Sequence, residues 1–216
     1  MESKTGLRER KKQQTRQLIG DTARRLFAER GFDAVTVGEV AREAEVSEAT
    51  VFNYFPTKED LFYSGLEAFE EELLSAIRER RPGESVIAAF RGFVLKPRGL
   101  VAETDPKAID RHAKAMRVIT DSPALLAREQ RILAGYTDAL ARLLAEETGA
   151  RDGSIEPWVV ANALIGVHRS LIDHVRRELA AGTHNPELSR RMLAEGRRAL
   201  DRLERGLGDY GVKPRE

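Results

Sequence analysis

One short stretch of the sequence carries several helix-terminus signals in succession. Thr36 and Glu39 have the spacing of a capping box, in which each residue satisfies a backbone amide of the other. Ser47 is a second N-cap residue, Pro56 disfavours helix at the residue before it, and Thr57 is placed to cap the helix that follows. Signals this close together leave the chain few arrangements. They predict two short helices, separated by a tight turn and flanked by longer helices.

The helix before this stretch is marked by its apolar period. Ile19, Ala23, Leu26 and Phe27 recur at helical spacing, and Gly31 suits a left-handed C-terminal cap. We therefore expect a helix from about residue 14 to residue 30.

Two short helices joined by a tight turn form a helix-turn-helix unit, whose second helix fits the major groove of DNA. In the second helix, Val51 and Phe55 stand four residues apart and are expected to face the core. The opposite side then presents Glu48, Ala49, Phe52 and Asn53 towards base edges, with Thr50 and Tyr54 towards phosphates.

The N-terminal segment is basic although the net charge of the chain is only +1. Residues 1–16 hold six basic and two acidic side chains, so this segment carries a local charge of +4. Such an arm can be a solubility tail, but beside a DNA-facing helix it favours nucleic-acid binding. We assign residues 1–14 to a basic arm.

Composition and motifs exclude several classes of protein. The chain has no cysteine, no signal-like N-terminus and no apolar run long enough to span a membrane, so we expect a cytoplasmic protein with no membrane partner. There is no strand followed by a glycine-rich phosphate loop, and no Glu-x-x-His repeat of a di-iron bundle. His168 and His174 are six residues apart and lie on different helix faces. We expect no catalytic residues, no metal site and no cofactor.

After residue 80 the sequence "RRPGES" breaks the helical pattern and marks a domain boundary. The remainder reads as further helices over about residues 84–95, 106–119, 123–149, 155–181 and 186–207, with no strand pattern. The predicted fold is all-α. The predicted domains are a helix-turn-helix domain at 15–62, a linking helix at 63–80 and a larger effector-binding and dimerisation domain at 81–216.

The stretch "ARRLFAERGFDAVTVGEVAREAEVSEATVFNYFPTKEDLF" resembles the DNA-binding domain of the TetR family of bacterial transcriptional regulators. The resemblance runs from about Thr15 to Leu61. It implies that Thr36 and Thr50 reach DNA phosphates and that Lys58 attracts phosphate at the start of its helix. It also implies that Glu48, Ala49 and Asn53 read bases, with Ser47, Phe52 and Tyr54 completing the DNA-binding set.

By chemistry, Asn53 suits adenine, Glu48 suits the amino group of cytosine, and Ala49 suits a thymine methyl. Glu48 is equally well explained as a helix-dipole residue, and that alternative stays open. The chain departs from the family pattern at Glu45, where glycine is usual in the turn, and at Phe52, where tyrosine is usual. A left-handed backbone at Glu45 costs about 1 kcal/mol, and Phe52 has no hydroxyl to donate to a phosphate.

The resemblance also implies a homodimer formed by the last two helices. Apolar residues on the first of these recur at helical spacing, and Gly196 with Ala199 would let a partner helix approach; the apolar residues are Val160, Leu164, Val167, Leu171 and Val175. The same stripe is equally consistent with an intramolecular core.

The middle helices are expected to enclose a ligand pocket, since pockets in helical proteins form between helices. The candidate lining residues are Phe90, Phe93, Met116, Tyr136, Trp158, Asn162 and His168. The segments that carry them are similar to the subset of the family that senses acyl-CoA-like or other apolar effectors.

Together these features predict a dimeric, sequence-specific DNA-binding transcriptional regulator. We expect a repressor that a small, largely apolar effector releases from a palindromic operator in double-stranded DNA. The alternative is a DNA-bound structural or division-control protein of the same fold without an effector.

Overall fold

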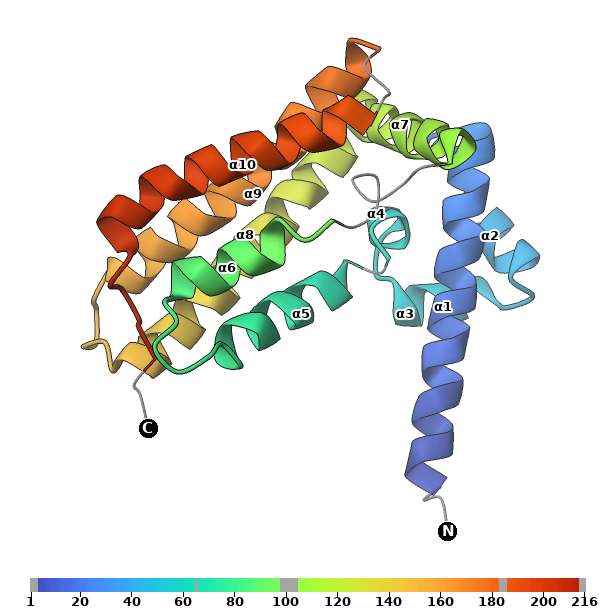
Figure 1. The fold of residues 1–216 in the computed structure, drawn as a ribbon. Coiled ribbons are helices and arrows are strands. Elements are labelled where there is room, and N and C mark those ends of the chain that lie inside the picture. Colours follow the sequence, from blue (N-terminus) through green and yellow to red (C-terminus); the bar gives the residue numbers. More distant parts are fainter. Residues whose placement is uncertain (1–3, 65, 98–104, 183–185, 214–216) are drawn as a thin grey trace. The chain divides into compact units, whose positions relative to one another are not determined.

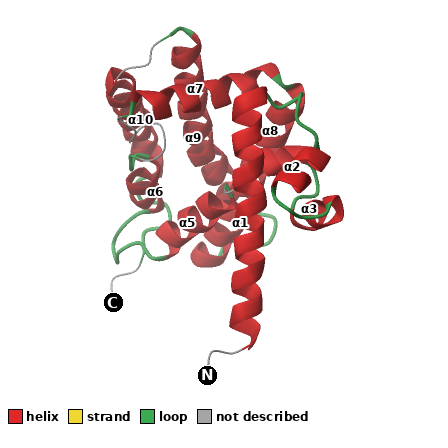
Figure 2. Ribbon diagram, turned by 90° about the vertical axis from the view of Figure 1, so that its right-hand side faces the viewer, coloured by secondary structure: helices red, strands yellow, loops and turns green. Residues whose placement is uncertain are grey.

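The structure is a computed structural model, and it describes residues 4–64, 66–97, 105–182 and 186–213. Across these ranges every regular element is a helix and no strand occurs, which confirms the all-α fold (Figure 1, Figure 2). In chain order the helices are α1 (Lys4–Arg30), α2 (Val37–Glu43), α3 (Glu48–Tyr54), α4 (Lys58–Phe62), α5 (Glu67–Arg78), α6 (Val86–Val94), α7 (Pro106–Asp121), α8 (Pro123–Thr148), α9 (Glu156–Ala180) and α10 (Pro186–Leu207).

The chain divides into two compact units, and the division falls within α5, α7 and α8. Unit 1 comprises Met1–Glu67 and Val118–Arg128, and unit 2 comprises Ala68–Arg117 and Glu129–Glu216. The end of α7 and the first turns of α8 therefore belong to unit 1, although they lie far along the sequence from its other helices.

Unit 1 is built on α1, which packs against α2 and α4, while α2 packs against α3. Its core is formed by fully buried side chains from all four helices, among them Ile19, Phe27, Val40, Val51 and Leu61. Aromatic rings extend this core, with ring centroids of Phe27 and Phe32 5.2 Å apart. The short helices are thus held by burial against α1, since helices of this length are not stable alone.

Unit 2 has two apolar clusters. The larger one joins α5, α6, α8, α9 and α10 around buried residues such as Ile77, Phe90, Leu140, Leu164 and Leu200. The second lies between α7, α9 and α10, and its buried members are Ala113, Leu171, Val175, Leu179, Leu188 and Met192. In Figure 1, α9 and α10 run side by side along this unit.

The predicted helix termini are confirmed where the structure describes them. The Thr36–Glu39 capping box is complete, and Ser47 accepts a hydrogen bond from the Thr50 amide over 3.1 Å. Gly31 has a φ of 86°, as a left-handed cap requires, and the helix before Pro56 ends at Tyr54. The sequence also predicts that Asn185 and Pro186 begin the last helix, but Asn185 lies outside the described residues.

Two helices differ from the sequence prediction. The first begins at Lys4 rather than near residue 14, so the described part of the basic arm is helical. The helix predicted from Thr57 to residue 80 is two helices, α4 and α5, separated at residues 63–66. The break is stabilised by Arg24, which donates to the carbonyl oxygen of Ser64 over 2.6 Å and also bonds its hydroxyl.

Among the described residues, none of the helices combines the length and the apolar character needed to cross a bilayer.

Candidate nucleic-acid interface

The turn between α2 and α3 contains the only non-glycine residue with a left-handed backbone among the described residues. Glu45 has a φ of 55°. The Val46 amide reaches back to the Ala41 carbonyl over 2.9 Å, and the Glu45 amide bonds the Arg42 carbonyl over 3.2 Å. These two bonds satisfy carbonyl groups at the end of α2, as in a Schellman motif. The turn therefore keeps the geometry that usually calls for glycine, which the sequence alone had left open.

Helix α3 has one buried and one exposed side. Val51 and Phe55 are 0% and 1% exposed, so the predicted core face is confirmed. Ala49, Phe52 and Asn53 are exposed on the other side, with Phe52 47% accessible. This face therefore combines an amide, which can hydrogen-bond to a base edge, with apolar groups, which can contact a thymine methyl.

Glu48 is not extended away from the protein. A Cβ atom at Gly38 would stand 2.6 Å from Glu48 Oε1, so the carboxylate lies directly against the first turn of α2. Glycine at residue 38 leaves the room for this approach. The position favours the interpretation of Glu48 as a helix-terminus residue, because a carboxylate is stabilised near the positive end of a helix.

The hydroxyl groups near the DNA-facing side are engaged within the protein. The Ser47 and Thr50 hydroxyl oxygens are 2.8 Å apart and hydrogen-bonded. The Thr36 hydroxyl donates to Glu39 over 3.0 Å, and Arg30 binds the same carboxylate over 2.8 Å. The hydrogen bonds from Thr36 backbone, Arg30 and the Thr36 hydroxyl, in that order of effect, lower the pKa of Glu39 from 4.5 to about 2.

Lys58, at the start of α4, rests on aromatic rings. Its ammonium nitrogen is 4.3 Å from the ring centroid of Phe32 and 5.9 Å from that of Phe27. Cation–π attraction of this kind limits the positions that a lysine side chain samples. Lys58 and the exposed face of α3 both belong to unit 1, as do Thr36 and Tyr54.

Arg16 was expected only to add positive charge to the N-terminal segment, but the structure shows that it contacts α3. Its Nη1 atom donates to the Tyr54 carbonyl over 2.7 Å, and its guanidinium lies 4.5 Å from the centroid of the Phe55 ring. Arg16 thus caps the C-terminus of α3 from α1. The local sequence does not indicate this contact, because Arg16 and Tyr54 are 38 residues apart in the chain.

The basic side chains of α1 between residues 8 and 12 are exposed. They are Arg8, Arg10, Lys11 and Lys12, and they share a helix with Arg16. A positively charged helix next to the exposed side of α3 is suited to the phosphate backbone of DNA.

The candidate ligand residues do not form one group. Phe93, Tyr136 and His168 come together around Phe69, whose ring centroid is 5.1, 5.4 and 4.6 Å from theirs, respectively. Phe90 is 1% exposed and belongs to the same core, whereas Met116 packs against the second cluster of unit 2.

Trp158 and Asn162 lie elsewhere. Trp158 is 41% exposed, and the Asn162 side-chain amide donates to the Trp158 carbonyl of its own helix. With the exposed Ile155 and Val159 they form a stripe along the first turns of α9. These two residues are therefore on a surface and not in the aromatic group around Phe69.

A groove of about 640 Å³ continues along α9 and α10. Small residues line it from both helices, namely Ala163, Gly166, Ser170 and Ala199. Of the apolar residues proposed from the sequence, Val160, Leu164 and Val175 are buried and do not line the groove, whereas Val167 and the largely buried Leu171 do line it. Gly196 is also internal, since a Cβ there would meet Leu95 Cδ2 at 2.6 Å. For these residues the intramolecular alternative holds.

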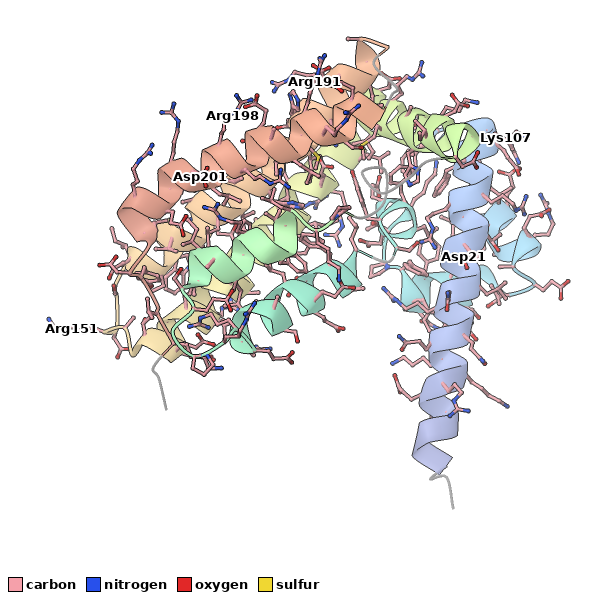
Figure 3. The ribbon with its side chains drawn as sticks, in the orientation of Figure 1. Asp21, Lys107, Arg151, Arg191, Arg198 and Asp201 are labelled. Carbon is pink, nitrogen blue, oxygen red and sulfur yellow. The ribbon has the colours of Figure 1, made fainter. Side chains whose placement is uncertain are left out.

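The charged residues of α10 that line the groove are Glu195 and Arg202, and the other charged side chains of this helix lie outside the groove lining. Figure 3 shows Arg191 and Arg198 projecting from α10, whereas Asp201 lies on the side towards α6. Asp201 and its neighbour Glu204 each bind Arg91 over 2.5 Å. Among the described residues no group of three or more histidine, cysteine or acidic side chains is arranged to hold a metal ion.

The sequence matches two known protein families. Residues 19–64 match the family described as bacterial regulatory proteins, tetR family, and residues 84–207 match the MftR C-terminal domain. The first match covers the helix-turn-helix of unit 1. The second covers more than half of the chain.

Individual proteins agree with these matches. The chain is 29% identical over 184 residues to MftR of Mycobacterium tuberculosis, whose name assigns it to transcriptional regulation of mycofactocin biosynthesis; the match covers 82% of this chain and 86% of that protein. It is 32% identical over 146 residues to the HTH-type transcriptional regulator TcmR of Streptomyces glaucescens, over 67% and 65% of the two chains.

Among solved structures, the complex of SmeT with triclosan is similar in fold, with a TM-score of 0.52 at 19% identity over 94% of this chain and 96% of that one. Fold, motif and family match agree from the first helix to the last. The chain belongs to the TetR family of bacterial regulatory proteins and is a DNA-binding transcriptional regulator.

Proposed function

We propose that the chain is a dimeric repressor that binds a palindromic operator and leaves it when a small, largely apolar effector binds unit 2. The observation that carries the proposal is the exposed side of α3. Its core face is buried, its C-terminus is capped by Arg16, and the groups left outside are those that contact bases.

Each DNA-facing residue has a proposed role. Ala49, Phe52 and Asn53 contact base edges, while Thr36, Thr50 and Lys58 contact phosphates. Ser47 and Tyr54 border the same face, and Glu48, the first residue of α3, supports it by placing its carboxylate against the first turn of α2. Asn53 is the strongest candidate for base reading, since an asparagine amide matches adenine with two hydrogen bonds.

The effector site is proposed at the aromatic group around Phe69. Phe93, Tyr136 and His168 all contact this ring, and apolar and aromatic surroundings suit an apolar ligand. Phe90 belongs to the same apolar cluster as this group, whereas Met116 packs against the second cluster and is not part of the proposed site. An acyl-CoA-like effector is consistent with these surroundings, and the related SmeT has been solved with triclosan bound.

The dimer is proposed to form through the exposed surface of α9 and α10. A twofold dimer presents two copies of α3, which matches the symmetry of an inverted repeat. The groove between the two helices is lined by small residues that let a partner helix approach. Regulation in this proposal is by binding alone, with no catalytic step.

The test is selection from a random pool of DNA duplexes with the purified protein, followed by binding to the enriched duplex at several salt concentrations. Enrichment of one inverted repeat, bound by two copies of the chain, is the expected result. Affinity should fall steeply as salt rises, because phosphate contacts release counterions.

Other outcomes would change the proposal. Enrichment of a direct repeat or a single half-site would remove the twofold dimer on the operator. Binding at many dispersed chromosomal sites far from promoters would favour the structural or division-control alternative over a repressor.

A further inference from the structure

The DNA-binding unit contains a segment from the second half of the sequence. Val118–Arg128, the corner between α7 and α8, belongs to unit 1 together with the helix-turn-helix. Within this corner Ile119, Ser122 and Leu125 are buried. The Tyr63 hydroxyl, just after α4, donates to the Leu125 carbonyl over 3.1 Å.

Arg128 makes the second contact between this corner and α4. Its Nη2 atom is 2.6 Å from Oδ1 of Asp60, whose side chain is only 13% exposed. Removing one partner of an ion pair that is largely shielded from water costs more than removing one partner of a pair on the open surface. One residue of α4, Asp60, and the residue just after this helix, Tyr63, are thus held by residues more than sixty positions later in the chain.

Asp60 divides its two oxygen atoms between two tasks. Oδ2 accepts from the Thr57 amide over 3.0 Å and from the Thr57 hydroxyl over 2.8 Å, which completes the capping box of α4. Oδ1 takes the guanidinium of Arg128. The carboxylate is therefore held from both sides, and the first turn of α4 is held with it.

Lys58 lies in that first turn. Its ammonium is already restrained by the Phe32 ring, so its remaining freedom depends on the backbone between Thr57 and Asp60. We propose that Arg128 is a positioning residue for DNA binding, which acts through Asp60 to hold Lys58 in its phosphate-contacting orientation. This inference rests on the proposed function of Lys58.

Helix α8, which carries Arg128, makes a second ion pair through the next residue. α8 continues without interruption from Arg128 to Glu129, and Glu129 pairs with Arg176 of α9 over 2.7 Å, with side chains 15% and 11% exposed. Glu129 and Arg176 belong to unit 2. Arg128 and Glu129 therefore make ion pairs at consecutive positions of α8, one within each unit.

The experiment compares full-length Arg128→Gln, Arg128→Lys and Arg131→Gln proteins on the duplex obtained by selection. Arg131 is an exposed arginine of the same helix, so its variant matches the change in charge. We expect Arg128→Gln to bind about fivefold to tenfold more weakly, in line with the loss of one charge-assisted hydrogen bond. Arg128→Lys should keep most of the affinity, and Arg131→Gln should remain within about twofold of the wild type.

A double-mutant cycle with Lys58→Ala separates positioning from other roles. If Arg128 acts through Lys58, Arg128→Gln has little further effect on affinity or salt slope once Lys58 is alanine. Asp60→Asn, which keeps an acceptor for the cap, should reproduce the loss and show no added effect with Arg128→Gln.

Three results would overturn the inference and leave the proposed function standing. Additive losses with a further drop in salt slope would make Arg128 a phosphate contact in its own right. A lower melting temperature with unchanged affinity would make the ion pair purely structural. Equal effects of Arg128→Gln and Arg131→Gln, with normal wild-type binding, would remove the inference alone. A wild-type protein that binds no duplex would remove the proposed function as well.

Discussion

At the scale of single residues, Glu45 occupies a backbone conformation that favours glycine. Its φ of 55° places a Cβ-bearing residue in the left-handed region at a cost of about 1 kcal/mol. We expect Glu45→Gly to raise the free energy of unfolding by about 0.5 kcal/mol, because relief of strain is partly offset by the greater freedom of glycine in the unfolded chain. Thermal and urea unfolding would measure the change.

Glu43→Gly is the matched control for that substitution. Glu43 is two residues earlier, at the end of α2, where the backbone is helical. The same replacement there should lower stability by about 1 kcal/mol. Equal destabilisation at both positions would show that the turn carries no strain that glycine relieves.

Glu39 provides a prediction about pH. Its pKa is about 2 in the folded protein against an ordinary 4.5, so its charge stabilises the fold fully above about pH 4.5. That contribution declines as pH falls towards 2. Since glutamine still completes a capping box, Glu39→Gln removes the charge and keeps the cap. The difference in melting temperature between wild type and variant should be constant above about pH 5 and shrink below pH 4.5.

Arg30→Gln checks the cause of the lowered pKa. Arg30 is the second contributor after the Thr36 backbone, so its removal should raise the pKa of Glu39 and move the transition to higher pH. Carboxyl chemical shifts followed by NMR would report the titration directly. A melting difference that stays constant down to pH 2 would contradict the role of the Glu39 charge.

The sequence was informative for residues whose structure depends on near neighbours. The caps at Thr36, Ser47 and Thr57, and the left-handed turn at Glu45, all depend on partners within a few positions. Arg16 and Arg128 were missed because their partners are distant in sequence. The sequence does not distinguish an arginine whose charge is solvated from one whose guanidinium caps another helix.

At the scale of elements, the recognition helix α3 depends on α1 for its C-terminus. Arg16 donates to the Tyr54 carbonyl and stacks on Phe55, so its positive charge meets the negative end of α3. We expect Arg16→Gln to destabilise the protein by about 1–2 kcal/mol and to speed hydrogen exchange at the last amides of α3. DNA affinity should fall with it, since a frayed helix presents its base-contacting side less often.

Lys12→Gln is the control for Arg16. Lys12 is exposed on the same helix, one turn earlier, and its removal changes the net charge by the same amount. It should leave amide exchange in α3 unchanged and act on DNA affinity only through salt. If both variants lower affinity and neither alters exchange, Arg16 contributes by charge and not as a cap.

The break between α4 and α5 could not be predicted from the sequence. The apolar period through Leu61, Leu66, Phe69 and Leu73 continues across the break, so the sequence reads as one helix. The interruption is favoured by Arg24 of α1, which binds Ser64, and by the turn bond from the Leu66 amide to the Tyr63 carbonyl. Tertiary contacts outweigh local periodicity here.

At the scale of the whole molecule, the chain order of the helices does not match the division into units. The sequence predicts one boundary near residue 80, because breaks in helical pattern are visible there. Val118–Arg128 belongs to unit 1, although α6 and nearly all of α5, which come earlier in the chain, belong to unit 2. The sequence around this segment does not indicate its unit, since Ile119 and Leu125 resemble the apolar residues of any amphipathic helix. The sequence analysis named Phe93, Tyr136 and His168 as candidate lining residues but did not name Phe69, because its contacts with them are distant in sequence.

The proposed dimer gives the prediction that belongs to this scale. Gly166 is exposed on α9 and lines the groove with Ala163 and Ala199, and a Cβ atom added to it would meet no neighbouring atom within 4 Å. We expect Gly166→Arg to fold normally, with a small gain in helix propensity, and to be monomeric. Light scattering after gel filtration would give the mass, and affinity for the inverted repeat should fall while binding to one half-site persists.

Gly135→Arg completes the argument as a matched control. Gly135 is likewise an exposed helical glycine, on α8, and a Cβ atom there would also meet nothing within 4 Å. Both variants add one arginine and gain the same helix propensity, so a difference between them reports the surface and not the substitution. A dimeric Gly135→Arg with a monomeric Gly166→Arg would assign the interface to the groove of α9 and α10. If both proteins remain dimers that bind the inverted repeat normally, the two copies must meet through another face.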